Sequence, residues 1–290
     1  MSNTIRLYAF ADEASPGLDG QIAALLRNGM QGLEIRGVDG ENVSDLAPGK
    51  AREVRRRLDG AGLVTWSVGS PIGKIDIMRD DFAAHLDKLR RTLDIARILG
   101  AANLRMFSFY LPAGEDPARF RDEVLARLLR MAEAARGSGV TLCHENEKGI
   151  YGDSAGRCLD IHTSLPEIAG VFDPANFIQC GQDTAEAWSL LKPHIRYLHI
   201  KDALADGSVV PVGHGLGRAA QIIGDYLASG GTAMTLEPHL KVFPGLSALE
   251  RDGAQSGVER YAYPTSDAAF DAAARALREL LDGLDENGGI

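Results

Sequence analysis

Short apolar runs alternate along the chain with segments of helical period, and this alternation constrains the fold more than any other feature. The runs are IRLYAF (5–10), GLEI (32–35), LVTWSV (63–68), NLRMFSF (103–109), VTLCHE (140–145), IAGVFD (168–173), IRYLHIKD (195–202) and AMTLE (233–237). Strict alternation of strands and helices predicts a parallel sheet, because each helix returns the chain to the edge where the previous strand began. Eight such units predict an α/β fold closed into a (β/α)₈ TIM barrel.

The segments between the runs support this interpretation. Residues 82–99, 120–135 and 268–284 carry apolar side chains at steps of three and four, which is typical of helices with one buried face. The alternative is an open doubly wound sheet, which predicts a G-x-G-x-x-G loop after the first strand. The sequence there is AFADEASPG, so the closed barrel is favoured.

No linker divides the sequence, so we expect a single domain over residues 1–290. The one long irregular stretch covers about residues 240–266, after the eighth predicted strand. Loops of this length are uncommon inside compact domains and often act as lids or contact surfaces. In a TIM barrel this loop would lie on the side where active sites form.

Composition and charge exclude several classes of protein. Apolar residues make up 45% of the chain, which indicates a folded globular protein. The chain has 31 Lys and Arg against 40 Asp and Glu, a net charge of −9, which disfavours nucleic acid as a partner. Its three cysteines are too few for a disulfide framework, and no run is long enough to span a membrane. We therefore expect a cytoplasmic protein whose partner is a small molecule; a homo-oligomer is left open.

Four ionisable residues stand at the ends of neighbouring predicted strands. They are Glu145, Asp173, His199 and Glu237. Each one alone is as easily explained by a helix cap, a surface charge or a packed histidine. Together they would place three carboxylates at one rim, where like charges are costly unless a cation relieves them. The donor set suits one divalent ion, Mn²⁺ or Mg²⁺, with Co²⁺ and Zn²⁺ as alternatives.

At these residues the sequence resembles the xylose isomerase-like barrels, the sugar phosphate isomerase and epimerase group. The resemblance covers essentially the whole chain and is strongest in HENE, FDPAN, YLHIKD, PVGHGLG and LEPH, which follow in order over 140–239. It implies that Glu145, Asp173, His199 and Glu237 bind the metal, Mn²⁺ being the first expectation. It also implies that Glu145 and Glu237 act as acid and base. One departure is Asn176, where many sugar epimerases have a histidine.

The resemblance implies proton transfer next to a sugar carbonyl, through an enediolate. One glutamate would remove the proton, and the other would return one to the opposite face or to the adjacent carbon. The first outcome is epimerisation and the second is isomerisation. A free Glu titrates near pH ~4.3, so the acid role is expected to need a raised pKa.

Several other residues are predicted to contact the substrate. They are Asn176, Lys201, His214, His239 and Arg105. Lys201 shares the strand face of His199, and His239 that of Glu237, although Lys201 could equally extend to solvent. Arg36 and Arg105 each suit a phosphate or carboxylate, and Glu34 is a further candidate for substrate contact. His85, His162 and His194 are expected on the surface.

Three other functions stay open from the sequence. The same metal and carboxylates could dehydrate a polyol or inosose. Lys201 ends a predicted strand, where a Schiff-base aldolase could place its nucleophile. A non-catalytic sugar-binding barrel is the third alternative, and it is disfavoured because binding alone does not need two bases.

Overall fold

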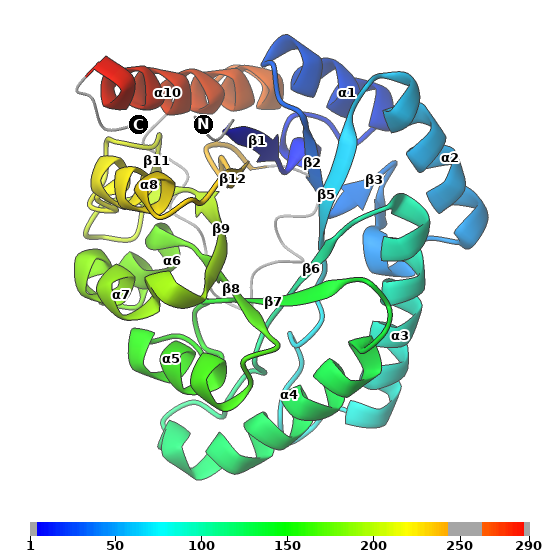
Figure 1. Cartoon of the computed structure of the whole chain (residues 1–290), viewed down its shortest axis with the longest axis vertical. Coiled ribbons are helices and arrows are strands. Elements are labelled where there is room, and N and C mark those ends of the chain that lie inside the picture. Colours follow the sequence, from blue (N-terminus) through cyan, green and yellow to red (C-terminus); the bar gives the residue numbers. More distant parts are fainter. Residues whose placement is uncertain (1–4, 243–262, 287–290) are drawn as a thin grey trace.

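The computed structural model describes residues 5–242 and 263–286, and these contain a closed barrel of eight parallel strands. The strands pair in the order β1-β12-β9-β8-β7-β6-β5-β2, and β2 closes the barrel on β1 (Figure 1). The strands are β1 (Arg6–Ala9), β2 (Gly32–Ile35), β5 (Val64–Gly69), β6 (Asn103–Met106), β7 (Thr141–Glu145), β8 (Ala169–Phe172), β9 (Ile195–Ile200) and β12 (Ala233–Leu236). Each lies within one of the predicted runs or extends one residue beyond it, so the predicted TIM barrel is confirmed.

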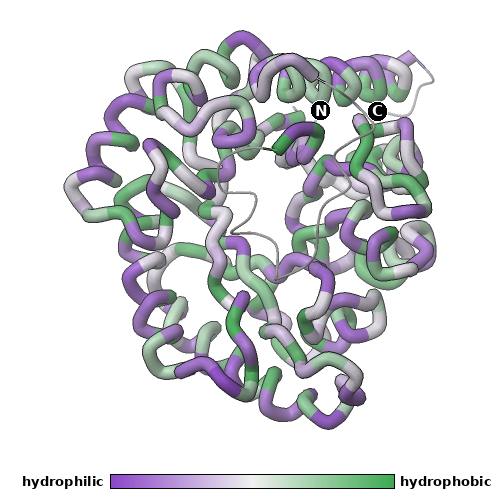
Figure 2. The backbone as a smooth tube through the Cα atoms, turned by 180° about the vertical axis from the view of Figure 1, so that it is seen from behind, coloured by the Kyte–Doolittle hydropathy of each residue, from purple (hydrophilic) through white to green (hydrophobic). Residues whose placement is uncertain are grey.

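Helices surround the barrel in the positions that a (β/α)₈ fold requires (Figure 1). They are α1 (Leu18–Arg27), α2 (Pro48–Gly60), α3 (Phe82–Leu99), α4 (Arg121–Ala135), α5 (Ala155–Ser164), α6 (Pro174–Gln179), α7 (Thr184–Leu191), α8 (Ala219–Ala228) and α10 (Ser266–Glu286). Figure 2 shows hydrophilic and hydrophobic residues mixed along these helices, as expected when only one face is buried. Within the described part of the chain, none of the helices is both long and apolar enough to cross a membrane.

The bounds of α3 illustrate how local sequence fixes an element. The Asp81 carboxylate caps its first turn by accepting hydrogen bonds from the amides of Ala83 and Ala84, at 2.8 and 3.2 Å. At the other end Gly100 adopts a left-handed conformation with φ of 74°, which a residue without Cβ reaches at little cost. The helix therefore covers the residues predicted from its apolar spacing.

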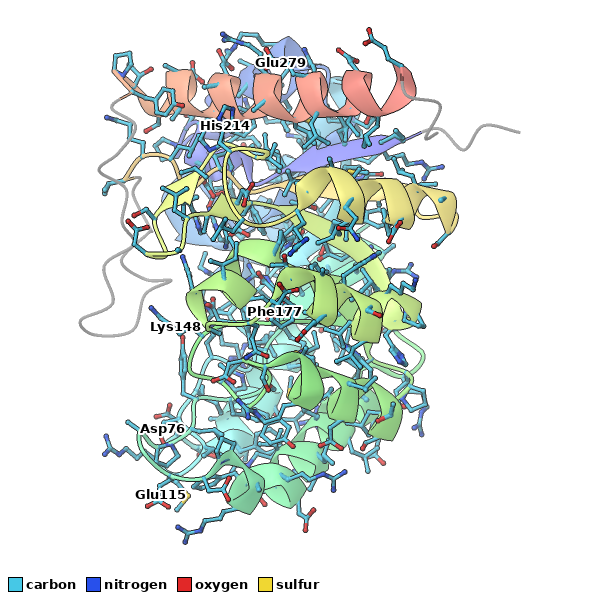
Figure 3. All side chains as sticks on the ribbon, turned by 90° about the vertical axis from the view of Figure 1, so that its left-hand side faces the viewer. Asp76, Glu115, Lys148, Phe177, His214 and Glu279 are labelled. Carbon is cyan, nitrogen blue, oxygen red and sulfur yellow. The ribbon has the colours of Figure 1, made fainter. Side chains whose placement is uncertain are left out.

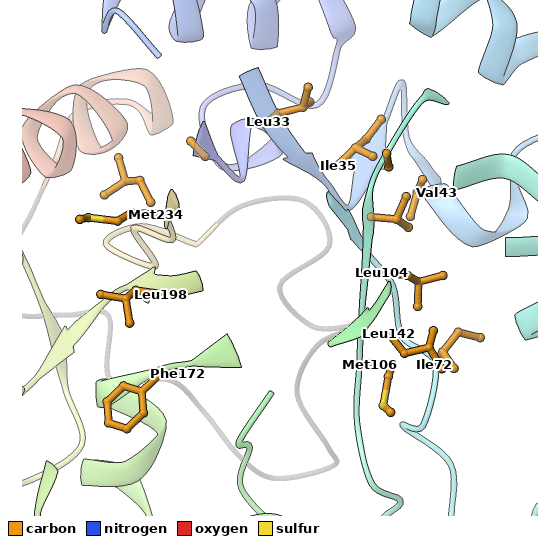
Figure 4. Close-up of a cluster of buried hydrophobic side chains, with 14 of the residues drawn as sticks. Leu33, Ile35, Val43, Ile72, Leu104, Met106, Leu142, Phe172, Leu198 and Met234 are labelled. Atoms are coloured by element: carbon orange, nitrogen blue, oxygen red, sulfur yellow. The ribbon is translucent and has the colours of Figure 1, made fainter. Parts of the chain in front are cut away.

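Side chains on the strands alternate between two apolar layers. Those that point outward pack beneath the helices; Figure 4 shows Leu33, Leu104, Leu142, Leu198 and Met234 pointing away from the centre of the barrel. A second, smaller layer fills the barrel itself, formed by Tyr8, Cys143, Val171, Tyr197 and Ala233. Residues of inward parity that follow this layer along the strands lie nearer the carboxyl ends, where the predicted site residues are.

Loops that follow the strands gather at one end of the barrel. Figure 3 shows Asp76, Glu115 and Lys148, which come after β5, β6 and β7, along one side of the molecule. Two short antiparallel hairpins extend this end: β3 (Gly37–Val38) with β4 (Glu41–Asn42), and β10 (Asp202–Ala203) with β11 (Val209–Val210). The long loop predicted at about 240–266 falls mostly on residues 243–262, which lie outside the described residues.

The prediction that two histidines lie on the surface is wrong. His85 is 8% exposed and His162 is 2% exposed. His85 Nε2 accepts a hydrogen bond from the Gly73 amide at 2.7 Å, and His162 Nδ1 lies 3.0 Å from the Ile168 carbonyl oxygen. Burial lowers the pKa of each to about 4, so both are neutral members of the packing.

Candidate metal centre and active site

The structure brings together the four residues predicted to bind a metal. Glu145 is the last residue of β7, Asp173 follows β8, His199 lies in β9, and Glu237 follows β12. These strands are consecutive neighbours in the barrel, which explains why their carboxyl ends converge. One donor atom from each residue lies within 4.8 Å of all the others, and all four side chains are buried.

His199 lies at the centre of this group. Its Nδ1 is 3.0 Å from Glu145 Oε1 and 3.2 Å from Glu237 Oε2, while its Nε2 is 3.1 Å from Glu34 Oε2. Burial would lower the pKa of His199, but the surrounding carboxylates of Glu145 and Glu34 outweigh it and raise the pKa well above its ordinary value. The ring lies with Nδ1 toward two of the predicted ligands, Glu145 and Glu237.

Glu145 divides its two oxygens between different partners. Oε1 faces His199 and also accepts a hydrogen bond from Asn176 Nδ2 at 3.2 Å, whereas Oε2 contacts Arg105 Nη1 at 3.0 Å. Burial alone would raise the pKa of Glu145, but His199 and Arg105 together lower it. Asn176 thus contacts a ligand directly, as does Arg105, and both lie at the site.

Asp173 links the site to the start of α6. Its Oδ1 accepts a hydrogen bond from the Asn176 amide at 2.9 Å, which caps the helix, and its Oδ2 lies 2.8 Å from Lys201 Nζ. Burial raises the pKa of Asp173 to about 7; Lys201 opposes this shift, and the charges of Glu237 and Glu145 add to it. Asp173 is therefore the ligand whose ionisation gains most from a further positive charge.

Glu237 is shared between two groups of charged side chains. Oε2 faces His199 and lies 3.4 Å from Lys201 Nζ, while Oε1 lies 3.5 Å from Arg36 Nη1 and 3.4 Å from His239 Nε2. Burial would raise the pKa of Glu237, but the cations around it, Lys201 first, hold the pKa well below its ordinary value. Like Glu145, it presents one oxygen to the centre and the other to an arginine.

The second group surrounds Arg36 and was only partly predicted from the sequence. Arg36 contacts Asp12 at 2.9 Å and Glu13 at 3.1 Å, and its side chain is 4% exposed. His239 donates its amide to Glu13 Oε2 at 2.6 Å. Glu13, Glu237 and His239 also satisfy the spacing for a metal, but the guanidinium of Arg36 already provides positive charge between the two carboxylates.

The Glu13 side chain was missed because it belongs to a 3-10 turn, Ala11–Glu13, directly after β1. Strand alternation says nothing about such a turn. The available signal is position: Asp12 and Glu13 follow the end of a strand whose neighbour in the barrel is β12, the strand that precedes Glu237.

The donor set fits a divalent ion. It offers three carboxylate oxygens and one imidazole nitrogen, the mixture that suits Mn²⁺, Mg²⁺, Co²⁺ or Zn²⁺. Among the described residues, the buried Asp173 Oδ2 and Glu237 Oε2 accept no hydrogen bond of good geometry, although both lie at ion-pair distance from Lys201. Such oxygens are available as metal ligands.

The predicted substrate-contacting residues divide into two sets. Arg105, Asn176, Lys201 and His239 all contact one of the four predicted ligands or lie beside one. His214 is exposed on the turn after β11, and within the described residues no hydrogen bond or ion pair joins its side chain to those ligands (Figure 3). The amides of this turn instead donate to the buried Asp202 carboxylate.

Comparison with known proteins identifies the family of the chain. A model of the family described as xylose isomerase-like TIM barrel matches residues 22–238. No curated protein sequence matches the chain.

Solved structures share the fold at low sequence identity. A D-allulose 3-epimerase from Methylomonas sp., solved with D-allulose, is 19% identical, with 97% of each chain covered and a TM-score of 0.72. A probable 3-DHS dehydratase, AsbF from Bacillus anthracis, is 15% identical, with 95% of this chain and 99% of the other covered and a TM-score of 0.71. The IolI protein, solved with a zinc atom, is 13% identical over 96% of this chain and 99% of its own, with a TM-score of 0.73.

Proposed function

Because the chain belongs to the xylose isomerase-like TIM barrel family, we propose that it is a divalent-metal-dependent isomerase or epimerase of a sugar or sugar phosphate. The observation that carries this proposal is the convergence of Glu145, Asp173, His199 and Glu237 within 4.8 Å at the carboxyl ends of adjacent strands. Structurally similar proteins include one solved with a ketose and one solved with zinc. Mn²⁺ is the first candidate for the ion.

In this proposal the four residues hold one ion, which would polarise the substrate carbonyl and stabilise the charge of the enediolate. Glu145 and Glu237 transfer the protons. Both are held ionised by neighbouring cations, which suits proton abstraction from the carbon next to the carbonyl. The pKa of both glutamates is lowered, so the expected raised pKa of the acid is not found. The glutamate that returns a proton must first take one up, from the substrate carbon in isomerisation or from solvent in epimerisation.

The surrounding polar side chains orient the reacting groups. Arg105 contacts Oε2 of Glu145, and Asn176 donates a hydrogen bond to Oε1, so together they fix the plane of that carboxylate. Among the described residues the Nε of Arg105 has no hydrogen-bond partner, and we assign it to a substrate oxygen. Lys201 and His239, on either side of Glu237, are the other substrate-binding residues of the proposal.

A dehydratase is the second candidate, and Lys201 is the observation in its favour. The same base could remove the proton next to a carbonyl while a β-hydroxyl leaves with a proton from a nearby cation. Burial lowers the pKa of Lys201, but Asp173 and Glu237 more than offset this and raise it, so the amine is protonated and available as a donor. One structurally similar protein is a probable dehydratase.

The same shift disfavours the Schiff-base aldolase, because that chemistry needs a neutral amine. Lys201 is also in ion-pair contact with two carboxylates, which further stabilise its charged form. Borohydride trapping with a panel of ketoses and ketose phosphates tests this point. Covalent labelling at Lys201 would support the aldolase.

Solvent exchange tests the proposed function even where the product is unidentified. The purified protein would be stripped with EDTA, reloaded with Mn²⁺ and incubated in D₂O with a panel of ketoses, ketose phosphates and cyclic keto acids. The proposal expects metal-dependent deuterium incorporation next to a carbonyl, followed by NMR and mass spectrometry. An unsaturated product would identify the dehydratase instead.

A matched pair of variants completes the test. Glu145→Gln should slow the exchange by about 10²- to 10⁴-fold, whereas the same change at Glu167, an exposed residue, should leave it intact. Exchange at the wild-type rate in Glu145→Gln, or exchange that EDTA does not stop, would contradict the proposal.

A further inference from the structure

Glu34 is a fully buried carboxylate on β2 that contacts His199, one of the predicted metal ligands. Its Oε2 lies 3.1 Å from His199 Nε2. Its Oε1 accepts hydrogen bonds from Tyr197 Oη at 2.9 Å and from Ser67 Oγ at 3.2 Å. Both carboxylate oxygens are therefore used, and neither is exposed to solvent.

The contact with His199 crosses the interior of the barrel. β2 and β9 are not neighbours, because β1 and β12 lie between them on the shorter path around the barrel. Tyr8, Trp66 and Tyr197 form an aromatic layer near Glu34: Tyr8 and Trp66 stack with ring centres 5.0 Å apart, and Trp66 meets the edge of Tyr197 at 6.0 Å. Burying a carboxylate in such surroundings is costly, which calls for a specific partner.

The contact decides which nitrogen of His199 can bind a metal. A neutral imidazole carries hydrogen on one nitrogen and a lone pair on the other, and the hydrogen-bond partner of the first nitrogen selects the tautomer. Glu34 accepts from Nε2, so in the neutral ring that binds a metal the lone pair lies on Nδ1. Nδ1 is the nitrogen that lies 3.0 Å from Glu145 Oε1 and 3.2 Å from Glu237 Oε2.

Loss of Glu34 would favour the opposite tautomer. The acceptors that His199 would retain, Glu145 and Glu237, both lie beside Nδ1. Hydrogen on Nδ1 would then donate to a carboxylate and would block that nitrogen as a ligand.

We infer that Glu34 is a positioning residue of the metal centre: it keeps hydrogen on His199 Nε2 and directs the Nδ1 lone pair toward the three carboxylate ligands. Tyr197 and Ser67 hold the Glu34 carboxylate in the plane that this requires. The inference rests on the proposed metal site, but it assigns Glu34 a role other than the substrate contact expected from the sequence. Partners of this kind change metal affinity by about 10- to 100-fold in other metal sites.

Three variants separate positioning from simple packing. Glu34→Leu removes the acceptor and puts an apolar side chain of similar size in its place. Glu34→Gln keeps a carbonyl oxygen that accepts from Nε2 and an amide that can donate to Tyr197 and Ser67. Tyr197→Phe leaves Glu34 in place and removes one of the hydrogen bonds that orient it.

Zinc binding and histidine NMR test the inference together. With Zn²⁺, which is diamagnetic, calorimetry gives the affinity, and two-bond ¹⁵N–¹H spectra of histidine-labelled protein give the tautomer. We expect the Nε2–H tautomer in the wild type and in Glu34→Gln. We expect about 10- to 100-fold weaker zinc binding and loss of that tautomer in Glu34→Leu, with a smaller loss of affinity in Tyr197→Phe.

Thermal unfolding of the metal-free proteins is the control for folding. A packing role would lower the melting temperature of Glu34→Leu without changing the tautomer or the zinc affinity of the folded fraction, and that result would overturn the inference. If Glu34→Leu does not fold, unchanged zinc affinity in Tyr197→Phe would overturn it as well. Wild-type protein that binds no zinc would overturn the proposed metal site itself.

Discussion

Two groups of charged side chains share Glu237, and they compensate the negative charge of their buried carboxylates in different ways. The metal group consists of Glu145, Asp173 and His199, which surround Oε2 of Glu237. The Arg36 group consists of Asp12, Glu13, Arg36 and His239, which lie toward Oε1. In the Arg36 group a guanidinium contacts three carboxylates. In the metal group two carboxylates meet the Nδ1 of an imidazole, and the third, that of Asp173, contacts Lys201.

This difference explains why two acidic clusters in contact can have different roles. A planar guanidinium donates hydrogen bonds to carboxylates in fixed directions, stays charged and is part of the chain. The positive charge of the Arg36 group is therefore permanent, unlike that of an exchangeable ion. The metal group leaves Asp173 Oδ2 and Glu237 Oε2 without good hydrogen bonds among the described residues. These oxygens can therefore bind an exchangeable ion beside Lys201, while Arg36 contacts the other oxygen of Glu237.

The largest effect is expected from removing the proton-transferring groups of the metal group. Glu145→Gln and Glu237→Gln should each lower kcat by about 10²- to 10⁴-fold, because an amide cannot accept the proton, while metal binding weakens only modestly. Steady-state kinetics on the substrate found by solvent exchange would measure this. Near-normal turnover in either variant would show that the roles of these glutamates are wrong.

Removal of Arg36 should act on stability more than on the metal group, because only one of its three carboxylate partners, Glu237, is a predicted ligand. Arg36→Met leaves Asp12 and Glu13 without their buried cation, and breaking a buried pair in this way costs about 3–5 kcal/mol. Urea unfolding in EDTA would measure the free energy of unfolding. Adding Glu13→Gln to Arg36→Met should recover part of the loss; strictly additive losses would argue that the two side chains are not coupled.

Metal should stabilise the folded protein through the metal group alone. At a free Mn²⁺ concentration of about 100 times Kd, the free energy of unfolding should rise by about 2.7 kcal/mol over the EDTA-treated protein. Asp173→Asn should remove most of this gain, whereas Glu13→Gln should keep it. Equal gains in the wild type and Asp173→Asn would place the bound metal elsewhere.

A further effect is a pH dependence that comes from Glu13. Burial raises the pKa of Glu13 to about 8, although Arg36 opposes the shift. Because the folded pKa lies above that of the unfolded chain, proton binding stabilises the fold fully below about pH 4.5, and this contribution is lost as the pH rises toward 8.

The wild type should therefore lose stability relative to Glu13→Gln as the pH rises from 5 to 8, with a slope of at most about 1.4 kcal/mol per pH unit. Urea unfolding of both proteins in EDTA across this range measures the difference. Parallel curves would show that Glu13 titrates normally.

The barrel was predictable because its strands are short, apolar and separated by helices of clear period. The metal group was predictable for a related reason: Glu145, Asp173 and Glu237 end strands that are neighbours in a barrel with consecutive order. Once the fold is assumed, strand parity is enough to place them at one rim. The helix at 82–99 was bounded correctly because both a cap and a terminal glycine mark it.

The remaining features depend on geometry that strand and helix periods do not encode. Glu13 lies near Glu237 because of a 3-10 turn after β1. Glu34 contacts His199 across the barrel, and this contact forms only when the sheet closes into a barrel. The burial of His85 and His162 arises from loops that fold back over helices: each ring meets a backbone group outside its own helix. Sequence period describes one face of a helix but not what covers it.

Metal stoichiometry in variants of the two groups tests the central claim most directly. Mn²⁺ binding would be measured by electron paramagnetic resonance and by elemental analysis after dialysis, for the wild type, His199→Ala and Glu13→Gln. We predict one ion per chain in the wild type and in Glu13→Gln, and none retained in His199→Ala. Two ions per chain, or one ion that survives in His199→Ala but is lost in Glu13→Gln, would contradict the account.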